Sequence, residues 1–194
     1  MKSYIIILRN HDKSEEYGSQ ALLTGKEQGW DVERFDAIDG RLNSLSEFNI
    51  KPTTLNKKCF NAFSRSGVIG CFLSHYSLWK KCLDKNKPIG IFEQDIIFQK
   101  SPIFNQEFSD ILRLDKPAMP GKNCGTGEWW EGSHAYILKP EGAKKLIQWT
   151  HEFGAFPSDV MLGNKILNIE FDTNNLTLLN MGSRKFSLTK SETF

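Results

Sequence analysis

The chain has 194 residues, of which 39% are hydrophobic, 25% charged and 12% aromatic. This length and composition suit one globular domain that buries about 70% of its unfolded surface and needs no disulfide or structural metal to fold. The net charge of +2 is too balanced for a dedicated nucleic-acid binder, and no apolar run approaches the roughly 20 residues that cross a bilayer, so we expect no nucleic-acid partner and no transmembrane segment.

The chain opens with an expected strand–helix–strand unit. Residues 4–8 are an apolar, β-branched run, which is typical of a buried strand. Ser14 and the two glutamates after it can start a helix that Gly29 ends, and residues 32–35 then read as a second strand. Such units imply an α/β fold with a mostly parallel sheet flanked by helices.

The central stretch, residues 67–98, is expected to be an amphipathic helix that leads into a buried strand. Apolar residues recur at helical three- and four-residue steps, at Ile69, Phe72, Leu73, Tyr76, Trp79 and Leu83. Residues 89–92 form a short apolar run behind a polar break, as in a strand covered on both faces. The polar residues 41–66 before this stretch are expected to form a long excursion or lid.

Two carboxylates stand at the end of the 89–92 strand. Side chains alternate in direction along an extended segment, so Glu93 and Asp95 are expected to point the same way and Gln94 the other way. Ligands of open α/β sheets bind beyond the carboxyl ends of the strands, where paired oxygens suit Mg²⁺ or Mn²⁺. The alternative, an ordinary polar strand end, is commoner for an isolated acid-x-acid triplet.

The second half of the chain is expected to contribute shorter elements. Residues 104–112 read as a short helix, residues 115–133 as a long loop and residues 134–138 as a strand. Pro140 suits the first turn of another helix, and Ser158 can cap a helix that extends to Ile166. Two more short strands are expected, at 169–171 and 176–179.

The chain shows no internal repeat and no domain boundary. Residues 1–180 are therefore expected to form a single domain, followed by a polar tail at 181–194. The four cysteines lack a Cys-x-x-Cys spacing, and no secretory signal precedes them. Reduced thiols and a cytoplasmic location follow as expectations.

Missing motifs argue against several enzyme classes. No Gly-x-Gly-x-x-Gly follows the first strand, and no phosphate-binding Gly-x-x-x-x-Gly-Lys-Ser/Thr is present, which argues against dehydrogenases and P-loop NTPases. Gly-x-Ser-x-Gly and His-Glu-x-x-His are also missing, which argues against α/β-hydrolases and zinc proteases. His75 lies at the margin of the helix, where a hydrogen-bonding core histidine is at least as plausible as a ligand contact.

Four segments occur in an order that resembles a known family. They are residues 34–40 (RFDAIDG), 67–79 (GVIGCFLSHYSLW), 91–96 (IFEQDI) and 134–146 (HAYILKPEGAKKL). Together they resemble glycosyltransferase family 25, the bacterial lipooligosaccharide galactosyltransferases and their collagen-modifying relatives. The resemblance spans roughly residues 4–165 and implies a single-domain GT-A-like fold, a nucleotide-sugar donor such as UDP-galactose or UDP-glucose, a divalent metal and inversion at the anomeric carbon.

The resemblance also implies roles for single residues. Glu93 and Asp95 match the acidic metal motif of the family. Gln94 departs from it, because the family more often has a second acid there, and the missing charge is expected to lower metal affinity. The expected donor-binding residues are Arg9, Ala37, Ile38, Asp39, Gly40, Ser74, His75 and Gln94.

Three carboxylates are candidates for the general base. Asp159 matches a Pro-x-Asp segment of the family and is the first candidate, although an acid in the first turn of a helix has a structural explanation too. Glu131 and Glu128 are rivals because they flank Trp129 and Trp130, on which an acceptor sugar could stack. The tryptophans can instead simply anchor their loop.

The resemblance therefore implies a metal-dependent inverting hexosyltransferase of lipopolysaccharide-type biosynthesis. It would move galactose or glucose from a UDP-sugar to a hydroxyl of a glycan, glycolipid or other glycoconjugate, with Mn²⁺ or Mg²⁺ bound, and the acceptor could lie at a membrane surface. One alternative is a non-catalytic nucleotide-sugar or glycan-binding relative. Another is a metal-dependent phosphoesterase, which explains the paired acids but not the other three segments.

Overall fold

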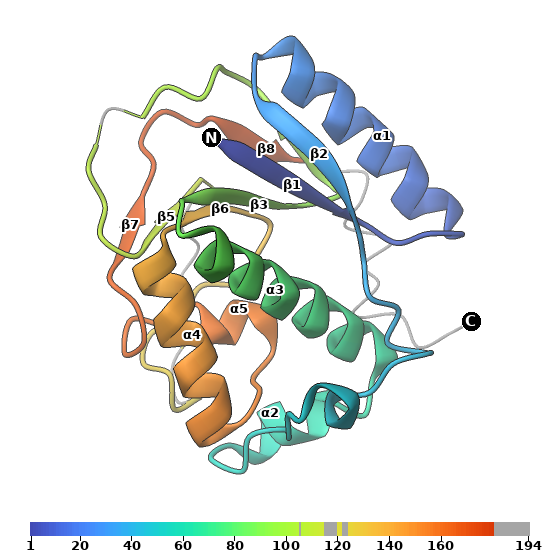
Figure 1. Ribbon diagram of the computed structural model, residues 1–194, viewed down its shortest axis with the longest axis vertical. Helices are drawn as coiled ribbons and strands as arrows, with labels where there is room; N and C mark the ends of the chain where they lie inside the picture. Colours follow the sequence, from blue (N-terminus) through green and yellow to red (C-terminus); the bar gives the residue numbers. More distant parts are fainter. Residues whose placement is uncertain (105, 115–119, 122–123, 181–194) are drawn as a thin grey trace.

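The computed structural model describes residues 1–104, 106–114, 120–121 and 124–180. Its main sheet has six strands in the order β2-β1-β3-β6-β5-β7, and a second, two-stranded sheet pairs β4 with β8 (Figure 1). The strands are β1 Lys2–Ile7, β2 Asp31–Asp36, β3 Ile89–Glu93, β4 Ile96–Phe98, β5 Ile111–Arg113, β6 Ala135–Leu138, β7 Ile169–Phe171 and β8 Thr177–Leu179. The helices are α1 Asp12–Glu27, the 3₁₀ turn η1 Leu45–Phe48, α2 Lys57–Ala62, α3 Ser66–Lys85, α4 Pro140–Phe153 and α5 Ser158–Met161.

Strand direction in the main sheet is mixed but mostly parallel. β1 runs parallel to both β2 and β3, and β5 runs parallel to β7. β6 lies between these groups and is antiparallel to β3 and to β5. The predicted mixed α/β sheet flanked by helices is therefore confirmed, and β6 runs against every other strand assigned to that sheet.

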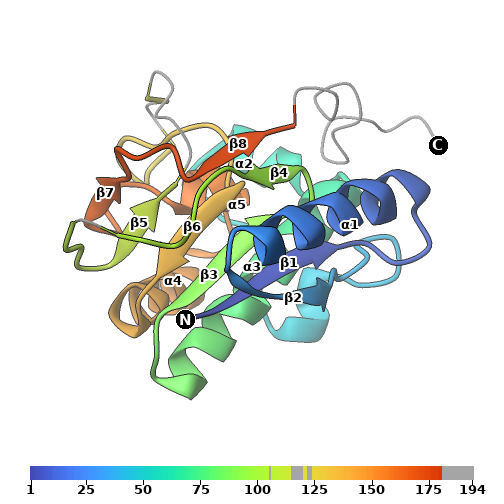
Figure 2. The same cartoon turned by 90° about the horizontal axis from the view of Figure 1, so that it is seen from above.

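Side chains alternate between two apolar cores along strands β1, β3, β5 and β6, as the two-residue period of a strand requires. In β1, Tyr4 and Ile6 enter one core, while Ile5 and Ile7 enter the other. The first core lies under α3 and α4, and the second lies under α1 and the β4–β8 pair. Figure 2 shows the sheet between these two layers. Burial on both faces explains why the strands read as continuous apolar runs.

Two expected helices are wrong. The segment expected as a helix over 104–112 ends instead in strand β5, because Ile111 and Leu112 enter opposite cores, which only an extended chain allows. Phe104, at the start of this segment, packs edge-on against Trp30, with ring centroids 5.9 Å apart. The helix expected to run from a Ser158 cap to Ile166 is also too long, because α5 ends at Met161 and its N-cap is Pro157.

Two further differences concern loops. Residues 41–66 contain η1 and α2, and Leu45, Ile50 and Cys59 from this segment are buried in the first core. Strand β4 was not expected as a separate element. The chain turns at Gln94 and Asp95 and then continues in an extended conformation. The expected polar tail at 181–194 lies outside the described residues. Within the described part of the chain, none of the helices has the length and apolar character that a membrane span requires.

Candidate active site

A pocket of about 1120 Å³ opens where several strands begin or end. The ends of β1 and β3, the loop after β2, the start of β6, and residues of α2, α3 and α5 line it. Its volume is slightly above the roughly 300–1,000 Å³ that is common for ligand sites. The pocket lies at the edge where open α/β sheets bind their ligands.

The loop after β2 is held against α3 by the Ser74 hydroxyl and by close backbone contacts. The Ile38 amide donates to Ser74 Oγ at 2.9 Å, and Ser74 Oγ donates to the Gly70 carbonyl at 2.7 Å. A Cβ on Gly70 would lie 2.5 Å from the Ile38 oxygen, and a Cβ on Gly40 would collide with the Ser66 carbonyl. Glycine at both positions therefore permits the close approach of loop and helix. Ser74 is buried and positions this loop.

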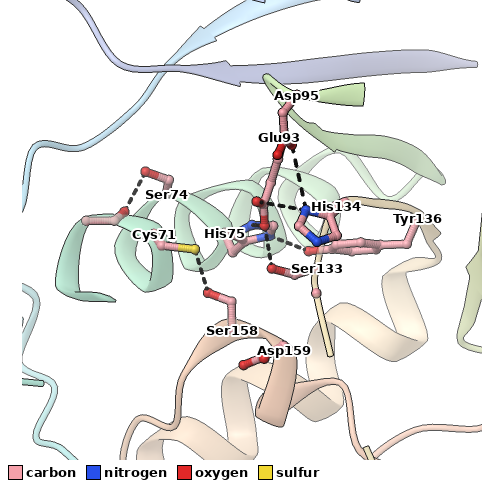
Figure 3. Close-up of polar contacts among 12 residues, drawn as sticks. Cys71, Ser74, His75, Glu93, Asp95, Ser133, His134, Tyr136, Ser158 and Asp159 are labelled. Carbon is pink, nitrogen blue, oxygen red and sulfur yellow. Dashed lines mark hydrogen bonds and ion pairs between the residues drawn. The ribbon is translucent and has the colours of Figure 1, made fainter. Parts of the chain in front are cut away.

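The paired acids converge, but not for the reason expected. Glu93 ends β3, while Gln94 and Asp95 form a turn, so the alternation argument for an extended segment was wrong. The two carboxylates meet through a histidine. His134 Nδ1 lies 3.3 Å from Glu93 Oε2 and 3.7 Å from Asp95 Oδ1 (Figure 3).

His134 reaches this place because β6 is antiparallel to β3. Ala135 pairs with Phe92, and the Glu93 amide donates to the His134 carbonyl at 2.8 Å. In a fully parallel sheet, a residue just before a strand would lie at the opposite edge. The sequence placed His134 only at the start of a strand and did not include it among the site residues. Its position in one of the four family-like segments was a signal that could have found it.

Opposite charges dominate the electrostatics of this cluster. Burial tends to raise the pKa of Glu93, but His134 and His75 outweigh that effect and hold the pKa well below its usual value. Burial likewise tends to lower the pKa of His134, but Glu93 and Asp95 hold it well above the usual value. Ser133 Oγ also donates to Glu93 Oε1 at 2.6 Å. Glu93 is therefore an ionised carboxylate in a buried setting.

The cluster fits a divalent metal. Glu93, Asp95 and His134 each offer one ligand atom, and these atoms lie within 4.8 Å of one another. His134 Nδ1 is buried and makes no hydrogen bond, although two carboxylates face it. An imidazole beside two carboxylates suits Mn²⁺ better than Mg²⁺, which prefers oxygen ligands alone.

The candidate bases lie in different places. Asp159 and Glu131 line the pocket, whereas Glu128 does not, and its amide donates to Asn164 Oδ1 at 2.9 Å. Asp159 Oδ1 accepts from the Val160 amide at 2.9 Å. Burial, and after it the charge of Glu93, raises the pKa of Asp159. Glu131 is exposed to solvent.

The two tryptophans also differ. Trp129 lines the pocket and packs against the first core. Trp130 makes an edge-to-face contact with Phe171 of β7, with ring centroids 5.0 Å apart. Trp130 thus anchors its loop to the sheet, whereas Trp129 is the one of the two that lines the pocket.

The remaining expected donor-binding residues are distributed unequally. Ala37, Ile38, Asp39, Gly40, Ser74, His75 and Gln94 line the pocket. Arg9 does not line it. Its side chain is 70% exposed and forms an ion pair with Asp36. Asp39 lines the pocket while its carboxylate is paired with Arg41, which lowers its pKa. His75 is almost fully buried and contacts the Tyr136 hydroxyl through Nδ1 at 2.7 Å.

Comparison with known proteins identifies the family. The family model described as "Glycosyltransferase family 25 (LPS biosynthesis protein)" matches residues 1–119. The chain belongs to glycosyltransferase family 25. The family predicted from the four segments is thus confirmed.

Several curated relatives are similar over most of this chain. Human procollagen galactosyltransferase 2 is 33% identical over 184 residues, which cover 81% of this chain and 28% of that protein. A glycosyltransferase 25 family member of Aedes aegypti is 31% identical over 172 residues, covering 74% and 28%. The rat relative named "Probable inactive glycosyltransferase 25 family member 3" is 27% identical over 139 residues, covering 58% and 24%. The chain spans about a quarter of the length of these relatives.

Solved structures with a similar fold are glycosyltransferases. The galactosyltransferase LgtC, in complex with donor and acceptor sugar analogues, superimposes with a TM-score of 0.50 at 10% identity, covering 88% of this chain and 73% of that one. An active-site mutant of LgtC has a TM-score of 0.52 at 9% identity, covering 88% and 72%. The predicted GT-A-like fold is therefore confirmed.

Proposed function

We propose that this member of glycosyltransferase family 25 transfers a hexose, galactose or glucose, from a UDP-sugar to a hydroxyl of a glycan or glycoconjugate. The observation that supports this most is the convergence of Glu93, Asp95 and His134 at one corner of a pocket large enough for a nucleotide sugar. A metal-dependent phosphoesterase would also use clustered acids, but it would not explain membership of this family.

The donor is proposed to lie between the loop after β2 and the acid–histidine cluster. Residues 37–40 face the pocket from one side and would contact the nucleotide. Glu93, Asp95 and His134 would hold Mn²⁺ or Mg²⁺. When bound, such an ion neutralises the charge that grows on a departing diphosphate, an effect worth several kcal/mol.

Asp159 is proposed as the general base. The acceptor hydroxyl oxygen forms a bond to the anomeric carbon while the bond from that carbon to the diphosphate breaks, and Asp159 takes the hydroxyl proton. A single displacement of this kind inverts the anomeric centre. The pKa of Asp159 is raised toward neutral pH, and a base is most effective when its pKa lies near the pH at which the enzyme works. Glu131 remains the rival on the same pocket.

A non-catalytic function is the second candidate, and one observation favours it. A relative that is 27% identical is named as probably inactive. Gln94, in the turn between the two acids, is the departure that would lower metal affinity. This candidate predicts that the protein binds a nucleotide sugar or glycan and transfers nothing.

Calorimetric titration of UDP, with Mn²⁺ and then with EDTA, is the direct test. We expect binding that requires the metal and is lost in Asp95→Asn. Asp84→Asn is the matched control, because Asp84 is exposed on α3 and does not line the pocket. Binding should then be followed by assays of transfer from UDP-galactose and UDP-glucose. No UDP binding under either condition would refute the donor assignment, and binding without transfer to any acceptor would favour the non-catalytic candidate.

A further inference from the structure

A second group of metal-ligating side chains lies beside the first. Cys71 and His75 are four residues apart on α3, so their side chains lie on one face of the helix. Both face Glu93 at the end of β3, and the three residues offer ligand atoms within 4.8 Å of one another. Figure 3 shows Cys71 and His75 on α3, below Glu93 in this view.

His75 is oriented so that one ring nitrogen points into this group. Its Nδ1 contacts the Tyr136 hydroxyl at 2.7 Å, and Trp79 Nε1 donates to the same hydroxyl at 2.9 Å. The His75 and Tyr136 rings are stacked with an interplanar angle of 15°. His75 Nε2 is left buried without a hydrogen-bond partner, 3.4 Å from Glu93 Oε1. A metal-binding histidine usually donates its second ring N–H to an oxygen acceptor, and the Tyr136 hydroxyl oxygen can accept from His75 Nδ1 in this way.

The two oxygens of Glu93 face different partners. Oε2 faces His134, and Oε1 faces His75. Glu93 thus belongs to both groups of possible ligands. One group adds Asp95 and His134, and the other adds Cys71 and His75. Ser158 Oγ lies 3.3 Å from Cys71 Sγ, where it can donate to a thiolate.

We propose that Cys71, His75 and Glu93 form a Zn²⁺ site. Thiolate, imidazole and carboxylate are all ligand types of Zn²⁺, and zinc sites with three protein ligands keep an open fourth position. With Zn–N and Zn–O distances of about 2.0–2.2 Å, the edge of a tetrahedron is about 3.4 Å long, which matches the separation of His75 Nε2 and Glu93 Oε1. Binding forms the Zn–S bond and releases the thiol proton to solvent. The pocket, which all three residues line, provides the open position.

Zinc at this site opposes the use of Glu93 by the neighbouring set. This consequence rests on the proposed function, in which Glu93 helps to hold the ion that binds the donor. Zn²⁺ is therefore an inhibitor of metal-dependent donor binding and transfer, and it acts through Cys71.

Zinc binding itself is tested without any nucleotide. Competition with a chromophoric chelator gives the Zn²⁺ affinity, and Co²⁺ as a probe reports a thiolate ligand through its charge-transfer absorption. Loss of a ligand atom should cost at least as much as loss of a residue that orients one, which is about 10–100-fold. We therefore expect Cys71→Ser to weaken Zn²⁺ binding at least 10-fold and to abolish the thiolate–cobalt band. Unchanged affinity and an unchanged band would overturn the proposal.

Cys82→Ser is the matched control, because the buried Cys82 thiol donates to the Lys87 and Leu138 carbonyls, away from the pocket. It should retain the affinity and the band. Far-ultraviolet circular dichroism and a thermal melt of both variants exclude unfolding as the cause. An equal loss of affinity in both variants would also overturn the proposal.

The inhibitory effect is measured against each protein's own zinc-free rate with Mn²⁺ present. Zn²⁺ should inhibit the natural protein and Cys82→Ser alike, with at least a 10-fold higher inhibitory concentration in Cys71→Ser. Equal inhibition of all three proteins would refute inhibition through Cys71. Absence of metal-dependent UDP binding would refute the proposed function, while the zinc titration would still decide the zinc site.

Discussion

One wall of the pocket is held by backbone packing, and another wall is held by polar side chains. The packed wall consists of residues 37–41 and α3, where Gly70 lets the helix approach the Ile38 carbonyl. The hydrogen-bonded wall consists of residues 124–135 and α5, and the buried Arg113 guanidinium supports it. Arg113 donates to the Trp130 carbonyl at 3.1 Å and to the Gly132 carbonyl at 2.6 Å.

The difference predicts how each wall fails. A backbone contact leaves no room for a side chain and cannot relax by a change of rotamer, so it is rigid but intolerant of substitution. The Trp130 and Gly132 carbonyls share one guanidinium, so a single substitution of Arg113 can loosen this part of the loop while the sheet stays intact. Substitutions in the packed wall should therefore lower the stability of the protein. Substitutions in the hydrogen-bonded wall should instead disturb the positions of Ser133 and His134.

The largest expected effect is on the metal cluster, where the two walls meet. Asp95→Asn removes a ligand charge, and an effect of several kcal/mol corresponds to a loss of about 10³-fold or more in transfer rate. Donor binding with Mn²⁺ should be lost as well, as measured by calorimetry. A fully active Asp95→Asn protein would refute the metal assignment.

Asp159→Asn should separate catalysis from donor binding, because Asp159 lies on the hydrogen-bonded wall and is not one of the proposed metal ligands. A positioned base contributes about 10²–10⁴-fold, so kcat should fall by that factor while metal-dependent UDP binding is kept. Asp95→Asn should be at least as damaging as this variant. Glu131→Gln, measured in parallel under saturating donor, decides between the two bases. If Glu131→Gln loses more activity than Asp159→Asn, Glu131 is the base.

Arg113→Met tests the hydrogen-bonded wall. It leaves the partly buried carbonyls of Trp130 and Gly132 without their charged donor, and hydrogen bonds to charged groups contribute about 1.5–3 kcal/mol each. We expect a loss of about 3 kcal/mol in the free energy of unfolding, measured by urea titration. Arg113→Lys should recover only part of it, because an ammonium lacks the guanidinium fork. Full recovery by lysine would show that charge alone holds the loop.

Gly70→Ala tests the packed wall. The new Cβ would lie 2.5 Å from the Ile38 oxygen and 2.9 Å from the Gly40 nitrogen. Overpacking of this kind costs about 1–3 kcal/mol, which a urea titration resolves. Gly29→Ala is a useful contrast, because its Cβ would meet nothing within 4 Å and only its positive φ of 78° is unfavourable. A neutral Gly70→Ala would show that the loop can move away from α3.

The smallest expected effect is on the pH dependence of stability. Because burial raises the pKa of Asp159 above its usual 3.8 in the folded protein, its contribution to stability is present below that pH and is lost as the pH rises through the folded-state pKa. Asp159→Asn should therefore melt at a higher temperature than the natural protein at pH 7, and the difference should shrink toward pH 4. Asp84→Asn, which removes a carboxylate exposed on α3, is the control. A constant difference across this range would contradict the raised pKa.

Much of the fold was predictable because it depends on local patterns. The opening strand–helix–strand unit, α3, β3 and α4 follow from apolar periodicity and helix-end signals. Short elements failed for a physical reason. Three residues such as Ile111–Arg113 are shorter than one helical turn and hardly longer than one strand period, too few to tell the two patterns apart, so their conformation depends on which cores receive them.

The candidate site shows the same division. The sequence by itself determined that Glu93 and Asp95 follow a buried strand, and that the loop at residues 37–40 follows another. It could not determine the direction of β6, because strand direction depends on sheet pairing between residues far apart in the chain. Only the tertiary structure decided that β6 runs antiparallel to β3, and that pairing brings His134 to both acids.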